Sequence, residues 1–201
     1  MRLPPYNTFE ASYRLFQTVE YWPEGTTFVS VVDPGVGSSR KSVVALTKTG
    51  QYIVTPDNGT LSYIKKVVGI EVVREISEVE NRRSNTELSY TFHGRDVYAY
   101  TGAKLASGHI SFEEVGPELP VDKILELPVV ETIIEDNLVR GAIDILDVRF
   151  GSLWTSITRD DFYALEPNFG DRFEVTIFNN DMLVYQNQVT YGKSFADVHI
   201  G

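Results

Sequence analysis

The pattern of apolar residues changes once along the chain, near Leu127, and this change limits the folds that the chain can adopt. Before it, helical and strand patterns alternate. Apolar residues recur every three or four positions over residues 8–22, with Thr8 as the expected N-cap and Pro23 ending the helix. Further helices are expected at 61–67 and 95–106, and compact β-branched strands at 28–32, 43–47, 52–55 and 70–76. Alternation of this kind predicts an α/β domain, with a mixed or parallel sheet layered with helices, over residues 1–126.

The second half reads differently. The polar stretch 77–86 is expected to be a loop within the first domain, whereas residues beyond 126 carry strand patterns and no convincing helix. The expected strands are 129–134, 142–146, 153–158, 173–178 and 182–190. Asn179, Asn180 and Asp181 predict a hairpin turn between the last two. We therefore expect a second, all-β domain over residues 127–201.

Composition excludes several classes of function. The chain of 201 residues has a formal net charge of −10, which argues against nucleic-acid binding because that role needs an electropositive face. It has no cysteines, so disulfides, thiolate metal sites and cysteine nucleophiles are excluded. No apolar run approaches the roughly 20 residues that a membrane-spanning helix needs, and no signal peptide opens the sequence. These features predict a soluble, cytoplasmic protein that binds neither nucleic acid nor membrane.

The loop from Asp33 to Ser42 follows a buried strand and is rich in Gly and Ser. It nearly matches a phosphate-binding loop, but Arg40 stands where that pattern requires glycine, and a strand follows in place of a helix N-terminus. A plain connecting loop would explain the glycines. It would not explain an Asp and an Arg at a strand end, which is where α/β sheets bind ligands.

His93 lies at the mouth of an expected helix, in the segment 91–96 of sequence TFHGRD. On its own, such a histidine is a capping or surface residue as readily as a functional one. A metal site is not expected, because His109 and His199 do not pair with it at ligand spacing. Asp33, Arg40 and His93 could instead form a cluster in which an Asp–Arg pair orients the ring for acid–base chemistry.

Two further motifs have ordinary structural explanations. The segment 147–154, of sequence DVRFGSLW, turns at Gly151 between two strands, as a β-turn beside a buried tryptophan would. Asp57, Asn58 and Gly59 form a strong turn signal after another strand. Neither motif indicates a function when it is considered alone.

Taken together and in order, these motifs resemble the S-adenosyl-L-methionine (SAM) hydroxide adenosyltransferase family, which also includes the fluorinase and chlorinase enzymes. The resemblance rests on VDPGVGSSR at 32–40, PDNG at 56–59, TFHGRD at 91–96 and FGSLWT at 150–155, with LPPY at 3–6 and WPEGT at 22–26. It covers essentially the whole chain. Four ordered motifs are far more specific than any one of them.

The resemblance implies an enzyme that cleaves SAM at the ribose C5′ carbon with water or hydroxide, giving adenosine and L-methionine without a cofactor or metal. It implies a homotrimer in which an α/β domain of one subunit and a barrel-like C-terminal domain of its neighbour enclose the substrate. The water-handling set falls on Asp33, Arg40 and His93. The implied substrate-binding positions are Tyr6, Thr91, Phe92, Gly94, Asp147, Ser152 and Phe195. Of these, Asp147 matches a carboxylate that receives the methionine amino group, and Phe195 an aromatic that stacks on adenine.

Two departures from the family pattern affect the expected site. Relatives begin with a strand and an aspartate-bearing motif that binds the ribose diol, and they continue past Gly201 into strands that contact adenine. The chain therefore looks truncated at both ends. Two alternatives stay open: a SAM-dependent halogenase of the same family, and a non-catalytic or interaction remnant.

Overall fold

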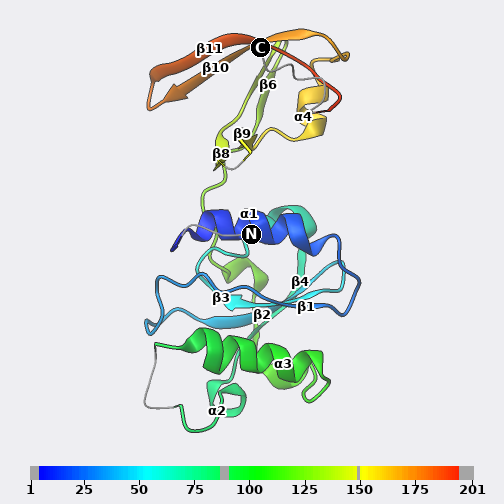
Figure 1. Cartoon of the computed structure of the whole chain (residues 1–201). Helices are drawn as coiled ribbons and strands as arrows, with labels where there is room; N and C mark the ends of the chain where they lie inside the picture. The colour runs from blue at the N-terminus through cyan, green and yellow to red at the C-terminus, as the bar shows by residue number, and fades with distance from the viewer. Residues whose placement is uncertain (1–4, 87–90, 149, 195–201) are drawn as a thin grey trace. The chain divides into compact units, whose positions relative to one another are not determined.

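The chain divides into two compact units, Met1–Val129 and Val130–Gly201, which are described separately. The computed structural model describes residues 5–86, 91–148 and 150–194 (Figure 1). The domain boundary expected between residues 126 and 127 stays a prediction. Within the described residues, no helix is both long and apolar enough to cross a bilayer.

A five-stranded mixed sheet forms the centre of the first unit, in the order β1-β3-β2-β4-β5. Its strands are β1 (Thr27–Val29), β2 (Ser42–Thr47), β3 (Tyr52–Pro56), β4 (Ile70–Glu75) and β5 (Glu118–Leu119). Strand β1 runs parallel to β3, and each other neighbouring pair is antiparallel. The expected mixed α/β architecture is therefore confirmed for this unit.

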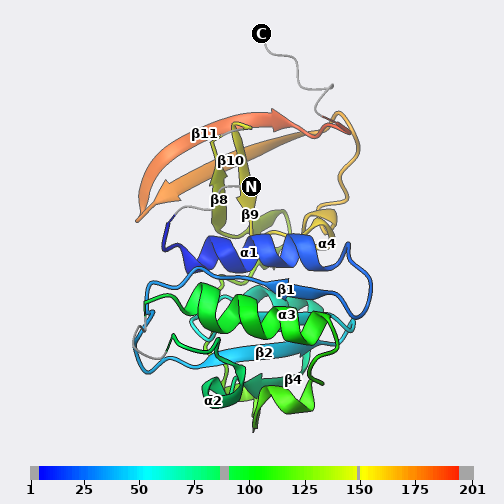
Figure 2. The same ribbon diagram turned by 60° about the horizontal axis from the view of Figure 1, so that its bottom comes forward.

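Helical segments cover both faces of the sheet, as Figures 1 and 2 show for α1 and α3. The segments are α1 (Thr8–Val19), η1 (Ile64–Val68), α2 (Glu78–Asn81), η2 (Gly94–Ala99), α3 (Tyr100–Ala106), η3 (Glu113–Val115) and η4 (Val121–Lys123). Alternate residues of β2 enter two different cores. Val43 and Ala45 pack with Leu15 and Val19 of α1, whereas Val44 packs with residues of η2 and η3. A strand buried on both faces needs such an unbroken apolar run.

Three local expectations for this unit are wrong. Asn7, rather than Thr8, caps α1, because its side-chain Oδ1 accepts a hydrogen bond of 2.9 Å from the backbone N–H of Glu10. The helix ends at Val19, three residues before Trp22. The polar stretch expected to be a loop contains the short helix α2, which a buried Asn81 ties to the carbonyls of Glu114 and Val115.

The second unit contains three two-stranded antiparallel sheets and one short helix within its described residues. The paired strands are β6 (Ile133–Glu135) with β7 (Leu138–Arg140), β8 (Ile143–Asp147) with β9 (Ser152–Thr155), and β10 (Arg172–Asn179) with β11 (Met182–Thr190). The last pair is a long curved hairpin (Figure 2). Its predicted turn is confirmed, because Asn180 and Asp181 both have positive φ values, 46° and 64°.

The all-β expectation needs correction in two respects. Helix α4 (Arg159–Tyr163) begins with a capping box in which Thr158 and Asp161 bond each other's backbone N–H groups. The three sheets are separate, so the described residues form no closed barrel.

Candidate active site

The candidate site lies where β1 ends and β2 begins. The connecting loop is held by the backbone N–H of Ser38, which donates to the carbonyl of Gly35 at 3.0 Å. The turn after β3 supports the same loop, because the Asn58 amide donates to the carbonyl of Val32 at 2.8 Å. The PDNG motif therefore has a structural role here, since it anchors the loop residue that precedes Asp33.

Asp33 and Arg40 form a forked ion pair across this loop. Arg40 Nε donates to Asp33 Oδ1 at 2.9 Å, and Nη2 donates to Asp33 Oδ2. The two side chains are only 6% and 10% exposed. Such a paired geometry fixes the guanidinium plane, so that Arg40 can present its remaining N–H groups in a set direction.

His93 completes the cluster. Arg40 Nη2 lies 2.9 Å from His93 Nδ1, and the residue is 4% exposed. The histidine immediately precedes η2, in which the backbone N–H groups of Arg95 and Asp96 donate to the carbonyl of Phe92. Burial lowers the pKa of His93; Arg40 and Arg82 lower it further, while Glu78 and Asp33 oppose them. The structure thus brings together the three residues that the sequence placed in one cluster.

Ser42 and Tyr98 extend the cluster on the side of the core, and no motif in the sequence indicated them. Arg40 Nη1 donates to Ser42 Oγ at 3.1 Å, and that hydroxyl lies 3.1 Å from the Tyr98 hydroxyl. The Arg40 guanidinium lies 5.5 Å from the Tyr98 ring centroid. Burial raises the pKa of Tyr98 far above its usual value, so this residue is a neutral phenol.

Arg82 and Glu78 border His93 on its other edge, and they too were missed. Arg82 Nη2 lies 2.9 Å from His93 Nε2 and 3.0 Å from a carboxylate oxygen of Glu78. The one available signal was their spacing of four residues, which places a Glu and an Arg on one helical face. Because the surrounding segment is polar and has no apolar stripe, it was expected to be a loop and this spacing was not recognised.

The other expected residues of the first unit lie at exposed or half-buried positions. Tyr6 is 75% exposed, has a φ of 67° and lies just before α1. Thr91 and Phe92 are also exposed. Gly94 starts η2 close to the loop after β1, and a Cβ added there would lie 3.4 Å from a Val31 methyl.

Asp147 and Ser152 belong to the second unit, where they face each other as partners across the β8–β9 pair. Both are half-buried. The adjacent turn contains Gly151 with a φ of 63°, as the sequence indicated. Trp154 is 36% exposed, so the expectation of a buried tryptophan is wrong. Phe195 lies outside the described residues.

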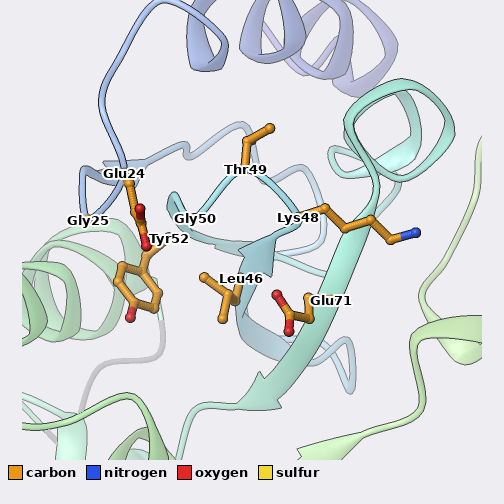
Figure 3. Close-up of a pocket in the computed structure, with 8 residues that line it drawn as sticks. All are labelled: Glu24, Gly25, Leu46, Lys48, Thr49, Gly50, Tyr52 and Glu71. Carbon is orange, nitrogen blue, oxygen red and sulfur yellow. The ribbon is translucent and has the colours of Figure 1, made fainter.

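A separate pocket of about 320 Å³ opens at the other end of β2 (Figure 3). Its lining residues are Glu24, Gly25, Leu46, Lys48, Thr49, Gly50, Tyr52 and Glu71. In Figure 3 the ammonium group of Lys48 extends away from the other labelled side chains. The pocket contains none of the expected site residues. Within the described ranges, no group of three or more His, Asp or Glu residues could hold a metal ion.

The candidate site is an Asp–Arg–His cluster that lies beside the strands of a mixed α/β unit. A cluster of this kind is typical of enzymes that move a proton. Residues 1–116 match the family described as the SAM hydroxide adenosyltransferase N-terminal domain, and the chain belongs to this family.

Curated relatives carry two kinds of name. The chain is 36% identical over 159 residues to a protein of Methanocaldococcus jannaschii named (R)-S-adenosyl-L-methionine hydrolase, covering 79% of this chain and 52% of that protein. A protein of the same name from Thermus thermophilus is 36% identical over 168 residues, or 78% of this chain and 60% of that one. A fluorinase of Actinopolyspora mzabensis is 25% identical over 218 residues, or 97% and 71% of the two chains. The chain thus spans about half the length of the hydrolases that it matches.

One solved structure is similar to this chain over nearly its whole length. The crystal structure of an uncharacterized conserved protein from Thermotoga maritima superposes with a TM-score of 0.86 at 34% identity. The match covers 98% of this chain and 71% of that protein.

Proposed function

We propose that this protein hydrolyses SAM to adenosine and L-methionine, by attack of water or hydroxide on the ribose C5′ carbon. The observation that carries the proposal is the buried Asp33–Arg40–His93 cluster, which lies within the segment that matches the family. The names of the hydrolase relatives support it.

In the proposed reaction a C5′–O bond forms while the C5′–S bond breaks, and the bonding electron pair goes to sulfur. Methionine leaves as a neutral thioether, so no acid is needed to protonate it. The attacking water must lose one proton. The enzyme's contribution is to hold this water in line behind C5′ and to remove its solvent shell.

His93 is the group that we propose accepts or relays this proton. The surroundings of the ring disfavour a lasting imidazolium, because it would face two guanidinium groups. The ring therefore passes the proton on to bulk water. Arg40 fixes the ring through Nδ1, and Asp33 fixes Arg40. The water is thus handled by a neutral, oriented imidazole.

Substrate binding is proposed for Tyr6, Thr91, Phe92, Gly94, Asp147, Ser152 and Phe195, on the residue-by-residue resemblance to the family. We also propose two domains, 1–126 and 127–201. A homotrimer with intersubunit sites, a cytoplasmic location and independence from any cofactor complete the proposal.

Replacement of His93 tests the proposed mechanism. We expect His93→Ala in the full-length protein to lower the rate of adenosine release from SAM by about 10²- to 10⁴-fold, the usual contribution of a positioned acid–base group. Chromatographic assay of adenosine measures this. Undiminished release would rule out the role of His93.

The pH profile gives a second check, with a definite sign. The pKa of His93 is lowered, so the ring is neutral at pH 7 and charges only below the usual histidine value of about 6.5. We expect kcat to be constant above neutral pH and to fall in acid, as the imidazole takes up its proton. A rate that rises as the pH falls from 7 to 5 would contradict a neutral His93.

A halogenase is the nearest rival, because fluorinases are among the relatives. The resemblance implies that halogenases replace the Asp–Arg–His set, which this chain retains. Incubation of the protein and SAM with fluoride or chloride decides between them. We expect adenosine alone, and a 5′-halo-adenosine product would favour the halogenase. Calorimetry addresses the remnant alternative, which would be favoured by no binding of SAM or adenosine at millimolar concentration.

A further inference from the structure

Both ring nitrogens of His93 face a guanidinium group. Nδ1 lies 2.9 Å from Arg40 Nη2, and Nε2 lies 2.9 Å from Arg82 Nη2. A guanidinium only donates hydrogen bonds, whereas a neutral imidazole has one N–H donor and one accepting nitrogen. The ring can therefore accept from one arginine at a time. A charged ring, with N–H groups on both edges, would oppose donors on both sides.

Arg82 is held rigidly enough to act on the ring. Its side chain is 6% exposed and is paired with Glu78 at 3.0 Å. Its neighbour Arg83 donates a backbone hydrogen bond of 2.9 Å to the carbonyl of Asp96 in η2, the segment that begins just after His93. Asn81, fully buried, accepts from Lys104 at 2.7 Å through Oδ1. These contacts fix the end of α2 against η2 and α3.

Among the described residues, the charged groups that act on His93 come from two segments of the chain. Arg40 and Asp33 come from the loop before β2, whereas Glu78 and Arg82 come from α2 and its end. Tyr98 of η2 packs edge-on to the ring, with centroids 6.5 Å apart. The two arginines disfavour the charged ring and the two carboxylates favour it. Loss of the Arg82 charge should therefore raise the pKa of His93, and loss of the Glu78 charge should lower it.

We propose that Arg82, oriented by Glu78, is a positioning residue that lies against the Nε2 edge of His93 and, with Arg40 at the opposite edge, keeps the imidazole neutral and confined between the two guanidinium groups. This inference rests on the proposed hydrolysis, in which His93 handles the attacking water. Arg82 acts through the ring. Its expected effect is therefore on the rate of the chemical step and on its pH dependence, and substrate affinity should be little affected.

Titration of the histidine ring by NMR tests the proposal without relying on catalysis. The chain has three histidines, so the His93 signal can be assigned by its loss in His93→Gln. We expect Arg82→Gln to raise the titration midpoint of His93, because a nearby positive charge is lost while Glu78 remains. We expect Glu78→Gln to lower it. Arg83→Gln, a matched change at the exposed neighbour, should leave it unchanged.

Kinetics on the same full-length variants complete the test. We expect Arg82→Gln to lower kcat by about 10- to 100-fold, the typical loss when a reacting group is misplaced by about 1 Å, with KM for SAM within about twofold. Arg83→Gln should have wild-type kcat. Arg82→Lys should bring the titration midpoint of His93 back towards its wild-type value, because lysine keeps the positive charge. It should restore kcat less fully, because lysine lacks the planar fork of the guanidinium group.

The outcomes separate this proposal from the proposed function. An unmoved His93 midpoint in Arg82→Gln, or midpoints that move the same way in Arg82→Gln and Glu78→Gln, would overturn the positioning role even if SAM is hydrolysed. Opposite midpoint shifts in a protein that does not hydrolyse SAM would support the positioning of the ring and contradict the proposed function alone.

Discussion

Strands β2 and β11 are both rich in apolar side chains, but they are buried to opposite degrees. Five of the six residues of β2 are buried, whereas all nine residues of β11 are exposed. An apolar pattern thus indicates a strand, and whether the strand is buried depends on what covers its faces. Helical segments cover both faces of the sheet that contains β2. The charged cluster at the start of β2 shares this burial, which strengthens its electrostatic interactions.

The largest expected effect of this difference in burial is on the charged cluster itself. Arg40→Met would leave the Asp33 carboxylate buried without its ionic partner, and we expect a loss of about 3–5 kcal/mol of unfolding free energy. Lys41→Met is the matched control, because its pair with Glu75 is 45% and 33% exposed and is expected to contribute about 0–1 kcal/mol. Urea denaturation of both variants measures the difference. Equal losses would mean that burial does not govern these ion pairs.

A smaller effect is expected when the same side chain is shortened in both strands. Val44 in β2 is fully buried, and Val184 in β11 is 51% exposed. Val44→Ala should cost about 2 kcal/mol, because two methyl groups lose their burial and a cavity remains. Val184→Ala should change the stability by about 0.5 kcal/mol at most. A loss at Val184 that matches the loss at Val44 would show that the exposed hairpin face is covered in solution.

The local chemistry of the sequence predicted much of the first unit. The strand assignments depended on compact β-branched runs, and each corresponding strand is present with ends shifted by a few residues. The cluster of Asp33, Arg40 and His93 could be anticipated because two of its members lie at one strand end and the third in a recognisable motif. Their burial could not be anticipated, because it depends on how helices from distant parts of the chain pack.

Residues that join the cluster from less patterned segments were not predictable. Arg82 lies after a four-residue helix with no apolar stripe. No helical or strand periodicity in the sequence predicts its contact with His93. Ser42 looked like the first residue of a strand, yet its hydroxyl links Arg40 to Tyr98. Helix α4 was missed for a related reason, since none of its residues is buried and only its cap signals its presence.

The smallest expected effect concerns the two capped helices. The Asn7 cap starts α1, which buries Leu15 and Val19 against the sheet, whereas the Thr158 cap starts α4, which buries no residue. Asn7→Ala should cost about 1 kcal/mol of unfolding free energy, because loosening α1 exposes core side chains. Thr158→Ala should release the amide protons of α4 to faster hydrogen exchange while global stability changes by less than about 0.5 kcal/mol, because fraying of this helix uncovers no core. Equilibrium denaturation combined with hydrogen exchange distinguishes the two responses. Equal global losses would show that α4 contributes to stability through its aromatic contacts, of which the Phe162–Phe173 pair, with centroids 5.1 Å apart, would be the first to replace.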